Sequence, residues 1–205
     1  MTHTTRAGVA QAVSNALLCA LYAIFVRVHA LQFLERPRAS YVLFVAMEAI
    51  VVVLALVRRP ADRTSWSPYA WATTLGGMAA PFFMRPVAAA HDIWVGQALQ
   101  VFGATVGLLG TLSLNRSFGL LPAHRGAIRS TGMYRWVRHP LYASYAVLQL
   151  GYLVNNPSLG NATFYGAAVV LQVLRLLNEE RFLAQYPEYE RYCSRTRWRL
   201  VPYVF

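Results

Sequence analysis

The stretch Gly132-Met-Tyr-Arg-Trp-Val-Arg-His-Pro-Leu-Tyr142 joins a densely charged segment directly to an apolar one. A basic loop, residues 115–131, precedes it. An apolar hairpin follows, and this hairpin ends on Asn178-Glu179-Glu180. This order predicts a reactive site at the point where a membrane hairpin meets water, with the rest of the chain arranged around it.

Arg138-His139-Pro140 predicts the start of a helix. Pro suits the first helical position, where its missing N–H costs nothing, and it pushes the preceding residue out of helical geometry. The helix should therefore begin at Pro140. Its free N–H groups and positive dipole end, beside Arg138 and His139, would form an anion site. The simpler interpretation is a basic stop at the membrane edge.

The composition is that of an integral membrane protein. Apolar residues make up 57% of the chain and charged residues 13%, against roughly 45–50% and about 25% in soluble domains. The net charge of +11 would suit nucleic acid, but no Arg-rich block with interleaved aromatics stands clear of apolar sequence. Two distant cysteines exclude a disulfide framework, and the five His lack the close spacing of a zinc site, so we expect no metal.

Six apolar segments have the length expected of membrane-spanning helices, about 20 residues or somewhat fewer. They are residues 7–26, 40–57, 68–84, 93–114, 141–154 and 159–177. Charge supports six crossings, because 15 of the 19 Arg then fall on one side and 4 on the other. Since basic loops stay in the cytoplasm, both termini and the active site should be cytoplasmic.

The sequence thus predicts an all-α, polytopic membrane bundle of five to six transmembrane helices. In the five-span alternative, residues 68–114 are partly re-entrant. The chain should form a single domain, residues 1–205. Residues 1–114 would supply the N-terminal spans, and residues 115–205 the cytoplasmic cofactor-binding loop, a helical hairpin and the tail.

Polar side chains form a stripe on each helix of the predicted hairpin. Helical spacing places Tyr142, Tyr145, Gln149 and Tyr152 on one face of the first helix, and Tyr165, Gln172, Arg175 and Glu179 on one face of the second. Polar groups are costly in lipid, so the stripes should face each other, a neighbouring span or a wet cavity. Arg175 and Glu179 either form an ion pair or bind different groups of a ligand.

Two further features bear on the site. Glu48, midway along the second predicted span, is either functional or paired to a polar group inside the bundle, and we favour the pairing. After Glu180, a short helix and a second helix initiated by Pro187 would place Tyr186, Tyr189 and Tyr192 on one side. They would cap the site or form an interfacial aromatic belt.

An ordered set of residues resembles the isoprenylcysteine carboxyl methyltransferase family. The set is Gly132, Tyr134, Arg138-His139-Pro140, Tyr142, Arg175, Glu179-Glu180, Tyr189, Tyr192, Arg199 and Pro202. It covers about residues 115–205, where Leu114-Asn-Arg-Ser-Phe-Gly119 is similar to the family's lead-in to its cofactor loop. In the first half of the chain only the broad pattern of spans agrees.

The resemblance implies a membrane methyltransferase that uses S-adenosylmethionine on a lipophilic substrate delivered from the bilayer. It implies cofactor contacts from Gly126, Ala127, Ile128, Arg129, Tyr134, Arg138, His139, Pro140, Leu141, Tyr142, Glu179 and Glu180. Arg175 would face the substrate, and the expected catalytic residues are Arg175 and Glu179. The family name leaves the acceptor open.

The chemistry favours a carboxylate acceptor, isoprenoid-like or lipid. A carboxylate is ionised without a base, and an Arg can orient it. A phospholipid amine or a thiol would first lose a proton, with His139 or Glu180 as the nearest base. NADPH-dependent sterol reductases have a similar Arg-His-Pro-x-Tyr step, but Leu141 and Ala143-Ser144-Tyr145 depart from their pattern. A non-catalytic membrane protein or transporter is the third alternative.

Overall fold

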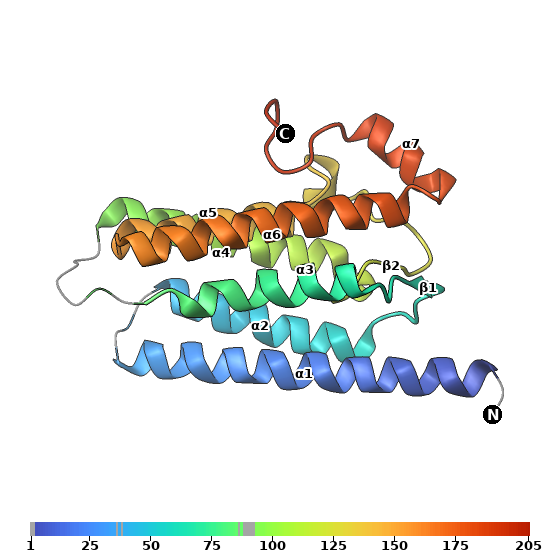
Figure 1. The fold of residues 1–205 in the computed structure, drawn as a ribbon, viewed down its shortest axis with the longest axis horizontal. Coiled ribbons are helices and arrows are strands. Elements are labelled where there is room, and N and C mark those ends of the chain that lie inside the picture. Colours follow the sequence, from blue (N-terminus) through green and yellow to red (C-terminus); the bar gives the residue numbers. More distant parts are fainter. Residues whose placement is uncertain (1–2, 36, 38, 86, 88–92) are drawn as a thin grey trace.

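The computed structural model describes residues 3–35, 37, 39–85, 87 and 93–205, and these form an all-α helical bundle (Figure 1). The helices are α1 (His3–Glu35), α2 (Ala39–Val57), α3 (Pro68–Ala79), α4 (Trp94–Leu114), α5 (Pro140–Asn155), α6 (Leu159–Leu183) and α7 (Pro187–Arg195). Short 3-10 turns are η1 (Ala80–Phe83), η2 (Asn115–Ser117) and η3 (Gly132–Arg135). The predicted all-α class is confirmed.

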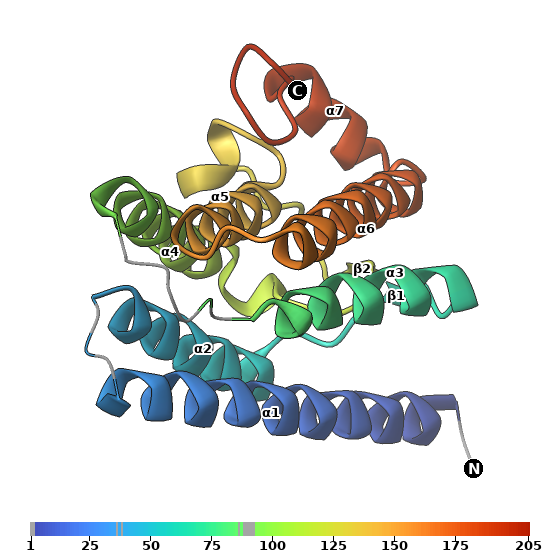
Figure 2. The same ribbon diagram turned by 60° about the vertical axis from the view of Figure 1, so that its left-hand side comes forward.

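The bundle has two layers, with α1 and α2 in one and α4, α5 and α6 in the other, while α3 packs along α6 (Figure 2). The start of α1, α7 and the two short strands lie toward one end of the bundle (Figure 1). The turn between α5 and α6 lies at the opposite end (Figure 1). The Arg-rich connections therefore gather at one end, as the charge count requires.

Three helical segments of the described residues are long and apolar enough to cross a membrane. They are Asn15–Glu35, Trp94–Ser117 and Leu159–Leu183. With 12 and 16 residues, α3 and α5 are shorter than the roughly 20 residues that a full crossing needs. These helices indicate a membrane protein. The number of crossings, five or six, and the cytoplasmic location of the site stay predictions.

Glycines allow α4 and α5 to pack with their backbones close together. A Cβ atom on Gly103 would lie 2.8 Å from the backbone nitrogen of Leu148. A Cβ atom on Gly151 would lie 2.6 Å from the carbonyl oxygen of Gly96 and 2.8 Å from the nitrogen of Gln100. Small residues at such crossings are the usual basis of tight helix packing in membranes. This contact fixes α5, and with it the residues that follow Pro140.

Asparagines tie the α5–α6 turn to the segment before α4. Asn155 Oδ1 accepts a hydrogen bond from the Ile93 backbone at 3.1 Å. Asn161 exchanges two hydrogen bonds of 2.8 Å with the backbone of Arg85. Buried backbone groups in a membrane protein need such partners, so the hairpin is held at its far end as well as at the site.

The structure differs from the sequence expectation at two places. Helix α1 runs to Glu35, and its candidate span is Asn15–Glu35, whereas residues 7–26 were expected. His29 Nδ1 in this helix pairs with the Glu48 carboxylate of α2 at 2.9 Å. The pairing expected for Glu48 is confirmed. Strands β1 (Arg63–Thr64) and β2 (Ala123–His124) form an antiparallel pair that the sequence did not predict.

Candidate functional site

A cavity of about 530 Å³ lies inside the bundle. This volume is in the range of pockets that hold small molecules and cofactors. The polar stripe of α5 lines it with Tyr142, Tyr145, Gln149 and Tyr152. From α6, Gln172, Arg175 and Glu179 line it, while Tyr165 does not. The expectation that polar residues of the hairpin share a cavity is thus confirmed for seven of the eight.

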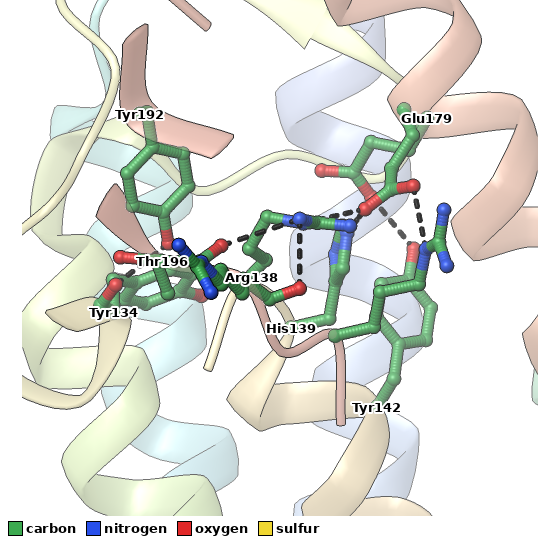
Figure 3. A network of polar contacts seen from close by, with 10 residues as sticks. Tyr134, Arg138, His139, Tyr142, Glu179, Tyr192 and Thr196 are labelled. Carbon is green, nitrogen blue, oxygen red and sulfur yellow. Dashed lines mark hydrogen bonds and ion pairs between the residues drawn. The ribbon is translucent and has the colours of Figure 1, made fainter. Parts of the chain in front are cut away.

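The centre of the site is a contact between the two helices of the hairpin. Tyr142 donates a hydrogen bond to Glu179 Oε2 at 2.8 Å (Figure 3). Arg175 places its guanidinium 5.3 Å from the Tyr142 ring centre and donates to the Leu120 carbonyl at 2.7 Å. Arg175 and Glu179 therefore use different partners, and the alternative of an ion pair between them is wrong. Arg175 Nε is buried with no hydrogen-bond partner among the described residues.

Glu180 joins the start of α5 to the tail. Its carboxylate accepts from Arg138 Nε at 2.8 Å and Arg199 Nε at 2.8 Å, and it lies 3.2 Å from His139 Nε2. The backbone N–H groups of Arg138 and His139 donate to the carbonyls of Trp198 and Arg199 at 2.9 and 2.8 Å. Figure 3 shows Arg138 and His139 at the centre of this network. We call these five residues the tail latch.

Helix α7 covers the same end of the cavity. The Tyr192 hydroxyl donates to the Tyr134 carbonyl at 2.7 Å (Figure 3). Tyr189 and Tyr192 are buried against Tyr134 and Leu183. Burial raises the pKa of Tyr134, so its phenol stays neutral at any physiological pH. These two α7 tyrosines therefore cap the site and do not form an exposed aromatic belt.

One comparison with known proteins identifies the family. A family model described as "Protein of unknown function (DUF1295)" matches residues 71–196, which is more than half of the chain. The chain belongs to this family. No protein with a curated description matches it. The DUF1295 match contains every residue predicted for the site, whereas Trp198 and Arg199 of the tail latch lie beyond its end.

Most of the predicted site residues of this DUF1295 protein lie around the cavity. The lining residues are Ala127, Ile128, Arg129, Tyr134, Arg138, His139, Leu141, Tyr142, Arg175 and Glu179. Gly126, Pro140 and Glu180 are not among them. Gly126 turns the loop with a positive φ of 82° and donates to Asp62 at 3.2 Å. Pro140 begins α5, as predicted.

Sequence reasoning missed His124 of the DUF1295 chain, which fastens the loop to α7. Its Nδ1 lies 2.9 Å from Asp62 Oδ2, and its Nε2 lies 3.0 Å from Glu188 Oε1. Its ring stacks on Tyr186 with centres 4.0 Å apart. The pKa of Glu188 is lowered by a hydrogen bond between the Glu188 carboxylate and its own backbone, and by the nearby His124. The partners are more than 60 residues away in the sequence on either side, so no local spacing indicates this contact.

Arg125, the next residue, is buried under the same loop. It donates to the Arg59 carbonyl at 2.6 Å and lines the cavity. Burial, together with the charge of Arg58, lowers its pKa to about 10. The guanidinium therefore stays charged at neutral pH and adds a fixed positive group to the loop end of the cavity.

Proposed function

We propose that this DUF1295 protein transfers a methyl group from S-adenosylmethionine to a lipophilic carboxylic acid in the membrane. The observation that carries the proposal is one cavity that contains both Tyr142–Glu179–Arg175 and the residues of the loop, η3 and α7. Apolar side chains also line the cavity, such as Val51 of α2, Met78 of α3 and Phe82 of η1. The cavity thus offers polar lining that would suit a charged cofactor and apolar lining that would suit a lipophilic acceptor.

The residues at the loop end fit the cofactor. The N-terminus of α5 suits a carboxylate, since its dipole end is positive. Glu179 is an acceptor for an ammonium group or ribose hydroxyls, and the buried Tyr189 hydroxyl has no hydrogen-bond partner among the described residues. Residues 127–129 and Tyr134 would enclose the remainder. Arg138 would contribute mainly through the tail latch, because Glu180 and two tail carbonyls already occupy it.

The chemistry needs little from the protein beyond binding and alignment. The cofactor, when bound, supplies a methyl group already activated by its sulfonium. Arg175 would hold the acceptor carboxylate through its unpartnered Nε, since an Arg orients a carboxylate by charge-assisted hydrogen bonds. Tyr142 keeps Glu179 in place, and α7 excludes water from the reacting atoms. The acceptor carboxylate needs no base.

Arg125 and Arg129 favour a second candidate, an NADPH-dependent reductase. Both line the loop end of the cavity, and Arg125 Nε is buried without a partner among the described residues. Arginine pairs well with phosphate as well as with carboxylate. The apolar helices alone would also serve a non-catalytic membrane protein.

Calorimetric titration of the purified protein in detergent separates these candidates. Binding of S-adenosylhomocysteine supports methyl transfer, binding of NADPH supports the reductase, and binding of neither supports a non-catalytic protein. A methyl-transfer assay with labelled cofactor on lipid extracts would then identify the product. A labelled product that is not a carboxyl ester would refute O-methylation while leaving methyl transfer in place.

The role of Arg175 is tested with a matched pair of variants. Arg175→Ala should lower kcat/KM by roughly 10- to 100-fold, the value of a hydrogen bond to a charged group. Arg181→Ala removes an exposed Arg from the same helix and should leave kcat/KM unchanged. S-adenosylhomocysteine affinity should be similar in both. Full methyl transfer by Arg175→Ala at limiting acceptor would contradict the assignment.

A further inference from the structure

Three glutamines from three different helices line the deep part of the cavity. Gln100 is on α4, Gln149 on α5 and Gln172 on α6. Their side chains are buried, with residue exposures of 3%, 8% and 8%. The methyl transfer proposed above uses none of them. A neutral polar cluster inside a membrane bundle therefore needs another explanation.

The glutamines share one level of the bundle. The Tyr142–Glu179 hydrogen bond places these two residues at a common height on the antiparallel helices α5 and α6. Gln149 and Gln172 each lie seven residues farther from the loop end, nearly two turns, which is about 10 Å at 1.5 Å per residue. Gln100 lies beside Gly151, whose added Cβ would be 2.9 Å from Gln100 Cγ. We call this level the glutamine layer.

The hydrogen-bonding capacity of the glutamine layer is largely unused. Gln172 Oε1 is buried with no partner among the described residues, and its Nε2 makes a single long bond of 3.4 Å to the Gly77 carbonyl. The amides of Gln100 and Gln149 make no side-chain hydrogen bond within the described part of the chain. Glu48 also lines the cavity, but it is already paired with His29.

Unsatisfied amides in such a place point to a ligand. Buried polar groups without partners cost folding free energy, and polar residues in membrane segments usually serve a function. Ligand pockets are typically apolar, with a few placed polar groups that fix orientation. An amide offers both donors and an acceptor and carries no charge, so it matches a hydroxyl, ketone or amide group and not an ion.

We propose that the acceptor carries a neutral hydrogen-bonding group on its chain, bound by the glutamine layer. This inference rests on the proposed methyl transfer for the position of the carboxylate, at Arg175. Along α6, Arg175 lies three residues from Gln172, a rise of about 5 Å. Along α5, Tyr142 lies about 10 Å from the glutamine layer. The neutral group should therefore lie roughly 5–10 Å from the carboxylate. The substrate class is an oxygenated amphiphilic acid and not a plain hydrocarbon acid.

The test is equilibrium binding to the full chain in lipid nanodiscs, with empty nanodiscs as the background. The probes are hexadecanoic acid and its mid-chain hydroxy and oxo derivatives. The wild type should bind the oxygenated acids about fivefold more tightly per hydrogen bond made, the usual net value of one such bond. Gln149→Leu and Gln172→Leu should abolish this preference, so that each variant binds the plain and the oxygenated acids equally well. Gln97→Leu, at an exposed position on α4, is the control.

The outcomes separate the two proposals. Equal affinity of the wild type for plain and oxygenated acids, or binding of neither, overturns the glutamine layer as a ligand site. So does a preference that survives both substitutions, because residues other than these glutamines then bind the neutral group. S-adenosylhomocysteine titration of the same samples reports on the cofactor independently. If the wild type prefers oxygenated acids but does not bind S-adenosylhomocysteine, the proposed methyl transfer is refuted and the glutamine layer remains a ligand site.

Discussion

Substituting Glu180 by Gln should loosen the tail latch and destabilise the protein. The side chain of Glu180 is 13% exposed, and that of its partner Arg138 is 8% exposed. Removing one member of a buried ion pair costs about 3–5 kcal/mol, because the other charge is left uncompensated. Arg199 is 35% exposed, so water screens its share of the loss. We therefore expect the free energy of unfolding to decrease by about 3 kcal/mol, the lower end of this range.

Thermal unfolding in detergent measures this effect. For a chain of this size, about 3 kcal/mol corresponds to a decrease in Tm of roughly 6–12 °C. Trypsin should also cleave at Arg195, Arg197 and Arg199 faster in the variant, since the tail loses its anchor. Glu190→Gln is the control, because Glu190 is exposed on α7 and should leave both measurements unchanged.

Two results would refute this reasoning. An unchanged Tm with unchanged tryptic cleavage would show that the latch does not hold the tail. An unchanged Tm with a large loss of S-adenosylhomocysteine affinity would show that Glu180 contacts the cofactor directly, as the family resemblance implies.

Three further predictions follow from single contacts. Gly151→Ala should lower the free energy of unfolding by about 1–3 kcal/mol, measured by thermal unfolding, because the new Cβ would meet backbone atoms of α4. Gly166→Ala, with open space around the new Cβ, should have no such effect. Equal effects of the two substitutions would contradict the close packing. Tyr142→Phe should weaken S-adenosylhomocysteine binding about fivefold in calorimetry, through loss of the hydrogen bond that holds Glu179; unchanged binding would place the cofactor elsewhere. His124→Ala should accelerate proteolysis within α7, and a wild-type cleavage pattern would show that the stack on Tyr186 is dispensable.

Local rules predicted the parts of this structure that depend on neighbours in the sequence. Pro140 sets the start of α5, and the i, i+3 and i+7 spacing from Tyr142 to Gln149 sets the face that meets the cavity. Both follow from helix geometry alone. The family match assigns no activity, so the proposed methyl transfer rests on the residue pattern and on the cavity that these residues line.

Helix geometry and local spacing do not predict contacts between segments that are distant in the sequence. Nothing near His29 in the sequence indicates Glu48 as its partner, and the first span was expected at residues 7–26, whereas the candidate span is Asn15–Glu35. Glu180 has a cofactor role by resemblance, but Arg138, His139 and Arg199, from two other segments, surround it in the fold. Helical periodicity places Glu179 on the face that meets the cavity, but it does not show that Glu180 pairs with the tail through Arg199.

The tail latch also sets an order of events during biosynthesis. Trp198 and Arg199 accept hydrogen bonds from the backbone of residues that the ribosome makes about 60 positions earlier. At roughly 5–20 residues per second, the nascent hairpin waits about 3–12 s with the start of α5 uncovered. The site is thus completed late in translation, although the stretch that defines it lies well inside the chain. Chains that stop before this point would leave the backbone N–H groups of Arg138 and His139 without their carbonyl partners.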